Sequence, residues 1–235
     1  MSHGKQFTLY THKSGPNGWK VAFVLEELGL SYHSIYIDFI KQEHRAAEHT
    51  QYNPNGRIPT LIDHHNGDFV IWESNAILLY LVDKYDKEHK ISVADEKDRH
   101  GLFQWLFFQA SGQGPYYGQV FWFKNAHPEP VPSAVERSSG RPASALLHSN
   151  EILRVFGVLD GVLAKQPSGW LVGGKLTIAD LSFVMWDLAA MTTALKDRPD
   201  VDVEKTYPAF YAWHQRLLKY ESVAKLLVVR ASLMN

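Results

Sequence analysis

The sequence predicts an α/β domain followed by an all-α domain, on the strength of three observations. Strand patterns occur only in the first third of the chain, in the order strand–helix–strand and then strand–strand–helix. After residue 98 the apolar positions recur at helical spacing and no strand pattern returns. Residues 86–98, between the two parts, are charged and lack apolar periodicity. We therefore expect a first domain over residues 5–86, a linker at 87–98 and an all-α domain over 99–235.

Local signals define the elements of the first domain. Gln6–Tyr10 predicts a short strand. Pro16–Gly29 predicts a helix, because proline suits the first helical turn and glycine the position after the end. The four predicted strands form a mixed sheet. The remaining elements are a strand at Ser34–Asp38, a polar helical or loop segment at 41–50, a hairpin pair at Thr60–Asp63 and Phe69–Trp72, and a helix at Ser74–Tyr85.

The second domain is predicted to contain only helices. Thr177-Ile-Ala-Asp180 has the form of a capping box, which is a folding signal and not a ligand site. Residues 138–148 contain Gly140 and Pro142, which should break or kink a helix, so they form a loop or a kinked helix. The expected helices are His100–Asn125, Asn150–Ala164, Thr177–Leu195 and Tyr207–Leu227.

Composition excludes several classes of protein. The formal net charge is 24 − 25 = −1, which argues against a nucleic-acid binder that needs a basic stripe. No apolar run has transmembrane length and the polar start carries no signal-peptide core, so we expect a cytoplasmic protein that does not bind membranes. The chain has no cysteine, so it can form neither disulfides nor a protein thiolate nucleophile. Its 12 histidines form no short-spaced ligand cluster, so we expect no metal site.

Two segments of the first domain together predict a site for a small acidic peptide. In Asn53-Pro-Asn-Gly-Arg-Ile-Pro-Thr-Leu-Ile62 a proline precedes a short apolar strand, and a cis Ile58–Pro59 bond there would leave a backbone edge free for an extended peptide. In Ile71-Trp-Glu-Ser-Asn-Ala-Ile-Leu-Leu-Tyr-Leu81 the pair Glu73-Ser74 stands at the start of a helical run. The unpaired N–H groups of a helix N-terminus suit a carboxylate.

These two segments resemble the glutathione transferase family. Further segments resemble the branch of that family that includes the fungal nitrogen-catabolite regulator and the bacterial nu-type enzymes. The resemblance extends over about residues 7–227. The segments that carry it at branch level are Thr8-Leu-Tyr-Thr-His-Lys-Ser-Gly-Pro-Asn-Gly-Trp-Lys-Val-Ala22, Asp38-Phe39, Glu43-His-Arg-Ala46, Trp105-Leu-Phe-Phe-Gln-Ala-Ser-Gly112 and Ala134-Val-Glu-Arg137.

The resemblance implies a thioredoxin-like first domain and roles for individual residues in binding glutathione. Glu73 would pair the γ-glutamyl amino group and Ser74 its carboxylate. Ile58, before the structural cis-proline Pro59, would bind the cysteinyl backbone. His44 and Arg57 are the candidates for the glycyl carboxylate.

Asn17, at the first helix N-terminus, matches the position that activates the glutathione thiol in this branch. An amide can donate to a thiolate but cannot act as a base, and the thiolate is the reactive species. Tyr10, Thr11 and Ser14 are the alternatives, with Tyr10 more simply explained as a packed core residue.

The electrophile is expected to bind between the domains. Gly112, Gly114 and Pro115 interrupt the helix that would face the first domain, and Tyr116, Tyr117, Trp122 and Phe123 follow as candidates for an apolar pocket.

By resemblance, the protein is a homodimeric glutathione transferase with glutathione as co-substrate and no metal. It would attack electrophiles, peroxides or disulfides, as in detoxification, with glutathione peroxidase and disulfide-reductase activities as plausible as conjugation. The alternative is a non-catalytic regulatory or binding protein of the same fold.

Overall fold

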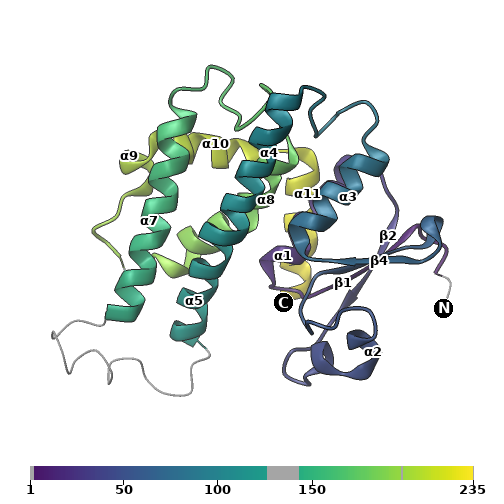
Figure 1. The fold of residues 1–235 in the computed structure, drawn as a ribbon. Coiled ribbons are helices and arrows are strands. Elements are labelled where there is room, and N and C mark those ends of the chain that lie inside the picture. The colour runs from purple at the N-terminus through teal and green to yellow at the C-terminus, as the bar shows by residue number, and fades with distance from the viewer. Residues whose placement is uncertain (1–2, 126–142, 197, 235) are drawn as a thin grey trace.

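The computed structural model describes residues 3–125, 143–196 and 198–234, and for 123–125 and 143–149 it describes the backbone alone. The N-terminal part is a four-stranded mixed sheet in the order β2-β1-β3-β4 (Figure 1). β1 (Phe7–Thr11) runs parallel to β2 (Tyr32–Tyr36) and antiparallel to β3 (Thr60–Asp63), which pairs with β4 (Phe69–Trp72). Helices α1 (Pro16–Glu27) and α3 (Ser74–Tyr85) lie on the side of the sheet that faces the C-terminal part.

The N-terminal elements agree closely with the predicted ones. The hairpin strands and α3 have the predicted bounds, whereas β1 begins one residue later and β2 two residues earlier than expected. The shift in β2 follows from its parallel register with β1, which pairs Phe7 with Tyr32. Gly29 takes a positive φ of 65° just after α1, as the stop signal predicted. The polar segment contains a 3₁₀ turn at Glu43–Arg45 and a short helix α2 (Ala47–Thr50).

In the described residues the C-terminal part is helical throughout. Its helices are α4 (Glu96–Phe108), α5 (Gly114–Asn125), α7 (Ala143–Leu163), α8 (Ile178–Ala189), α9 (Val203–Thr206), α10 (Pro208–Leu218) and α11 (Glu221–Met234). The helix expected at His100–Asn125 is divided by a π-helical turn at Gln109–Gln113, and a second π-helical turn follows α8 at Ala190–Ala194.

Three other helix boundaries differ from the predictions. α4 begins at Glu96, inside the segment expected to be the linker, because the Asp95 carboxylate accepts bonds from the backbone N–H groups of Lys97 and Asp98 (2.9 and 3.0 Å). The prediction of a single helix over Tyr207–Leu227 was wrong, because the structure has two helices there. α10 begins at Pro208 and ends at Leu218, and α11 begins at Glu221. Residues 143–148 are the start of α7, while Gly140 and Pro142 lie outside the described residues.

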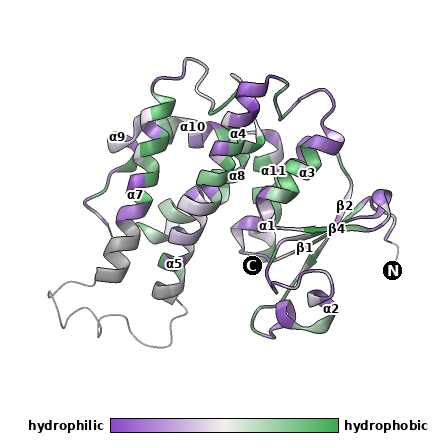
Figure 2. Cartoon of the chain, in the orientation of Figure 1, coloured by the Kyte–Doolittle hydropathy of each residue, from purple (hydrophilic) through white to green (hydrophobic). Residues whose placement is uncertain are grey.

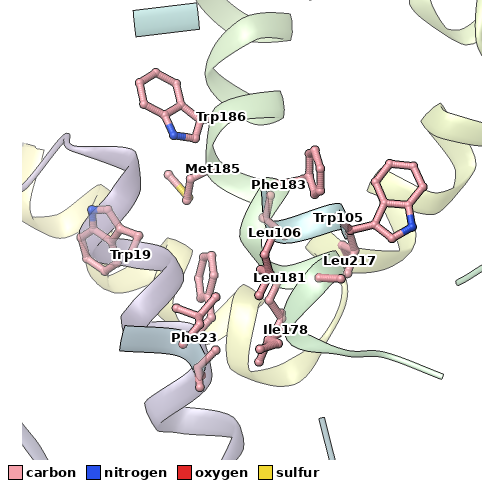
Figure 3. Packing of buried hydrophobic residues seen from close by; sticks show 14 of the residues in the cluster. Trp19, Phe23, Trp105, Leu106, Ile178, Leu181, Phe183, Met185, Trp186 and Leu217 are labelled. Carbon is pink, nitrogen blue, oxygen red and sulfur yellow. The ribbon is translucent and has the colours of Figure 1, made fainter. Parts of the chain in front are cut away.

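Both parts share one hydrophobic core. Trp19 and Phe23 of α1 face Met185 and Leu181 of α8 (Figure 3). Figure 2 shows hydrophobic stretches on the strands, on α3 and on α8. In the part of the chain that the structure describes, no helix is long and apolar enough to cross a membrane. The continuous core holds the sheet and the helical part in one arrangement.

Asp180 in the first turn of α8 connects three segments of the helical part. It is fully buried, and Oδ1 accepts from the backbone N–H of Leu171 (3.1 Å) and the indole N–H of Trp213 (2.9 Å). Oδ2 accepts from the backbone N–H and the hydroxyl of Thr177 (2.9 and 3.0 Å), which completes the predicted capping box.

We predict that Asp180→Ala lowers the free energy of unfolding by about 3–5 kcal/mol, because it leaves several buried donors without an acceptor. The matched control is Asp202→Ala, which removes an exposed N-cap of α9 and should lower it by only about 1 kcal/mol. Urea unfolding of the three proteins measures both differences. Equal losses in the two variants would show that Asp180 serves only as a helix cap.

Candidate functional site

A cleft between the two parts of the molecule contains most of the candidate site residues. It consists of two adjoining cavities of about 310 and about 500 Å³, which share the side chains of Asn17, Glu73, Ser74 and Trp186. The smaller cavity also borders the turn before β3, including Arg57, Ile58 and Pro59. The larger cavity has a mostly apolar wall formed by Ala76, Leu79, Phe103, Leu106, Phe107 and Pro115.

The turn before β3 presents a backbone edge to the smaller cavity. The Ile58–Pro59 peptide bond is cis. The buried Asn53 holds the turn, because its Nδ2 donates to the Arg57 carbonyl (2.8 Å) and to Thr60 Oγ1 (3.0 Å). Within the described residues, no hydrogen bond uses the backbone N–H or carbonyl of Ile58. Both groups are therefore available to an extended ligand.

The N-terminus of α3 borders both cavities. Glu73 precedes the helix with φ +69°, a conformation that L residues rarely adopt and that is found disproportionately at functional sites. No side chain caps this helix, so the N–H groups of its first turn lack a side-chain acceptor. The Ser74 hydroxyl lies among them on the cavity wall. Together they form a site suited to a carboxylate, with the exposed Glu73 carboxylate beside it for a cation.

Asn17, near the N-terminus of α1, is oriented by a residue of the other domain. Its Oδ1 accepts a hydrogen bond from the indole N–H of Trp186 on α8 (2.9 Å). Because an indole nitrogen can only donate, the amide must turn its oxygen toward Trp186 and its NH₂ group elsewhere. The NH₂ group is thus the part of Asn17 that can serve a ligand in the cleft.

Lys20, which sequence analysis did not single out, lies one helical turn after Asn17 and lines the larger cavity. It is only 1% exposed, and its ammonium donates to Asn75 Oδ1 and to Gln109 Oε1, both at 2.7 Å. Burial lowers the pKa of Lys20 to about 7, against the opposing effect of Glu73. A single lysine in an apolar helix would normally be interpreted as a solvent-facing residue, so only its position in the fold identifies it.

The two candidates for the glycyl carboxylate differ in position. Arg57 lines the smaller cavity and is exposed. His44 is not on its wall but lies behind Phe39, whose ring it meets edge-to-face at 4.8 Å. Burial, followed by Arg45 and Arg57, lowers the pKa of His44, so its imidazole is neutral at pH 7 and can offer a hydrogen bond but no charge.

The three alternatives to Asn17 line neither of the two cavities. The Thr11 hydroxyl is buried under α1, where a Cβ on Gly18 would lie 1.8 Å from it. The Tyr10 ring packs against Tyr52 and His49, which agrees with its interpretation as a packed residue. Ser14 hydrogen-bonds His12 Nδ1 (3.1 Å).

The predicted aromatic pocket has a different composition in the structure. Tyr117 belongs to the core: it is fully buried and packs on Phe156 and Trp186, because α5 turns this face toward α7 and α8. Tyr116 and Trp122 are 38% and 52% exposed and line neither cavity. The Phe123 side chain lies outside the described part. The predicted break in the helix does border the larger cavity, through Gly114 and Pro115. The aromatic residues that line this cavity are instead Phe103, Phe107 and Trp186.

Among the described residues, no group of three or more histidine, cysteine, aspartate or glutamate side chains is arranged to hold a metal ion.

Comparisons with known proteins agree with this architecture. Residues 5–83 match the model of the glutathione S-transferase N-terminal domain, and residues 124–221 match that of the C-terminal domain. Glutathione S-transferase 2 of Schizosaccharomyces pombe is 48% identical over 95% of this chain and 94% of its own.

Two crystal structures of Phanerochaete chrysosporium enzymes also superpose well. The transferase URE2P6 in complex with oxidized glutathione is 55% identical, with a TM-score of 0.87 over 99% of both chains. Ure2p5, cocrystallized with 1-(S-glutathionyl)-2,4-dinitrobenzene, is 49% identical, with a TM-score of 0.86 over 99% of this chain and 98% of that one. The two crystal structures are of the Ure2 type, and the chain belongs to the glutathione S-transferase family.

Proposed function

We propose that the protein binds glutathione in the smaller cavity and activates its thiol for attack on a substrate held in the larger one. One observation carries this proposal: the free backbone groups of Ile58, the uncapped start of α3 and the amide of Asn17 border the same cavity. A γ-glutamyl peptide needs this combination of a backbone edge and a carboxylate site. Structures of related proteins with oxidized glutathione and a glutathionyl conjugate support the assignment.

In this arrangement each residue contributes one interaction. Ser74 and the first-turn N–H groups of α3 bind the γ-glutamyl carboxylate, and Glu73 binds the amino group. Ile58 pairs with the cysteinyl backbone, and Arg57, with His44 behind it, faces the glycyl end. The Asn17 NH₂ group donates to the sulfur, which favours the thiolate over the thiol without removing the proton.

The larger cavity is suited to an apolar substrate, because most of its exposed wall is apolar. Conjugation of electrophiles, reduction of peroxides and reduction of mixed disulfides all begin with the same thiolate. Steady-state turnover with glutathione against an aryl halide, an organic hydroperoxide and a mixed disulfide ranks the three. Glutathione binding without turnover of any of them would instead identify a regulatory or binding protein.

We also propose, from the family, that the chain forms a homodimer. Light scattering during size exclusion should then give about twice the 26.8 kDa of one chain.

We predict that Ser74→Ala weakens glutathione binding by about 1–3 kcal/mol, the usual loss for a hydrogen bond to a charged group. Titration calorimetry measures this difference. Ser232→Ala is the matched control, because this hydroxyl donates to its own helix on α11 (2.7 Å to the Val229 carbonyl) and should leave affinity unchanged. Equal affinities of the Ser74 variant and the parent would reject the carboxylate site.

We predict that Asn17→Ala raises the pKa of the bound glutathione thiol by about one unit, equivalent to about 1.4 kcal/mol, with affinity little changed. Trp186→Phe keeps an aromatic ring but removes the N–H that orients the amide, so it should shift the pKa in the same direction by less. Ultraviolet titration of the thiolate measures both.

Trp170→Phe serves as the control, since Trp170 packs on Arg216 and lines neither cavity. Superimposable titration curves for the parent and the Asn17 variant would reduce Asn17 to a helix-end residue.

A further inference from the structure

Lys20 is placed where a group that handles protons would be needed. It lines the same cleft as Asn17, on the same face of α1 and one turn further into the helix. Neighbouring positions of this kind lie about 5–6 Å apart at Cβ. A sulfur atom held by the Asn17 NH₂ group would lie in the cleft that both residues line.

One of the three N–H groups of the Lys20 ammonium is left for such a role. Two of its three N–H groups donate to Asn75 Oδ1 and Gln109 Oε1, and the described residues provide no third acceptor. In the neutral amine this third position becomes a lone pair. Either form therefore retains both structural hydrogen bonds. The ammonium can donate its third proton, and the neutral amine can accept a proton through its lone pair.

The surroundings allow the charge of Lys20 to change without loss of structure. Glu73 at the start of α3 is the charged group that favours the ammonium. On the side of α8, Gln109 donates to Gln113 (3.0 Å), which donates to Asp187 (2.7 Å). Burial raises the pKa of Asp187 well above its ordinary value, which disfavours a negative charge at this end of the chain of bonds.

Other residues packed around Lys20 do not oppose this change. α4 contributes the Leu106 carbonyl, which accepts from Asn75 (2.7 Å). On α11, Lys225 pairs with Glu26 at the far end of α1 (2.5 Å). A lysine that titrates near pH 7 holds and releases a proton at working pH, which is the best condition for an acid–base group.

A merely structural tie between α1 and the π-helical turn would not require a lysine. Burying an ammonium in an apolar interior is costly, and a neutral side chain of similar volume often stabilises a core as well or better. The lysine is more easily explained by a use for its proton than by the two hydrogen bonds alone.

We propose that Lys20 is a catalytic residue that accepts the proton of the glutathione thiol and returns it to the leaving oxygen of an organic hydroperoxide. This inference rests on the proposed glutathione site. The neutral amine takes the thiol proton and forms a thiolate and an ammonium. The thiolate attacks the distal oxygen of the hydroperoxide, so that a sulfur–oxygen bond forms and the O–O bond breaks.

The remaining steps balance the reaction. The departing alkoxide takes the proton from the Lys20 ammonium and leaves as an alcohol, which restores the amine. Sulfur has lost two electrons to the peroxide and is now glutathione sulfenic acid. A second glutathione condenses with it to give glutathione disulfide and water.

The substrate's leaving group provides the test. Chloride leaves an aryl chloride without a proton, whereas an alkoxide needs one. Lys20→Met should slow both reactions at neutral pH, because the thiol pKa rises when the neighbouring cation is lost. Raising the pH to about 9 should restore the aryl chloride rate, while the hydroperoxide rate should stay lower by about 10²-fold or more, since its proton donor is missing.

Two further proteins complete the experiment. Because the chain has no cysteine, Lys20→Cys can be alkylated in denaturant at that single thiol with 2-bromoethylamine and refolded, which restores an amine at the same position. This aminoethylated protein should recover the hydroperoxide rate. It tests the role of the amine even where Lys20→Met folds poorly. Lys225→Met, at an exposed lysine that pairs with the same helix, should behave as the parent.

The outcomes distinguish a failure of the proposed function from a failure of the role of Lys20. If the parent protein binds no glutathione in calorimetry, the proposed function itself fails. If it binds glutathione and turns over, the role of Lys20 is overturned by equal recovery of both rates at high pH in Lys20→Met, or by an aminoethylated protein that folds but stays as slow as Lys20→Met.

Discussion

A lysine ammonium buried between two packed units must donate its hydrogen bonds to acceptors that the surrounding elements provide, and the middle of this molecule meets that need. Lys20 comes from α1, Asn75 from α3 and Gln109 from the π-helical turn after α4. These bonds join the N-terminal part to the C-terminal part beside the apolar core that both parts share. The relative position of α1 and α4 follows from this, and with it the shape of the cleft.

The two ends of the cleft are built on different principles. The polar end depends on local devices within one domain: a turn held by Asn53, a cis bond, and a helix N-terminus without a cap. The apolar end exists only because residues of α3, α4, α5 and α8 come together. Asn17 lies at the junction, and its amide is oriented by Trp186, a residue 169 positions away in sequence.

The sequence predicted best where structure is decided locally. The hairpin strands and α3 have the predicted bounds, because turn residues and a helix start mark them directly. The elements that depend on distant partners were less predictable. The register of β2 is set by β1, and the split between α10 and α11 was missed because helical periodicity continues across it.

The same dependence on distant contacts decides which site residues could be predicted from the sequence. Sequence motifs identified Ile58, Glu73 and Ser74, which border the smaller cavity. They could not show which aromatic residues face the cleft, since Tyr117 and Phe107 share the same aromatic-rich segment and only packing assigns one to the core and the other to the cavity. Nor could they identify Lys20 or Trp186, whose importance comes from the contact between domains.

The bond between Trp186 and Asn17 has a consequence for how such a protein can diverge. The groups suited to holding the peptide are encoded within the first 86 residues, whereas the orientation of the amide that would face the sulfur is encoded on α8. Substitutions in the helical part can therefore change reactivity while ligand recognition is inherited intact. A lineage could in this way lose, regain or redirect its chemistry without passing through a form that no longer holds the peptide.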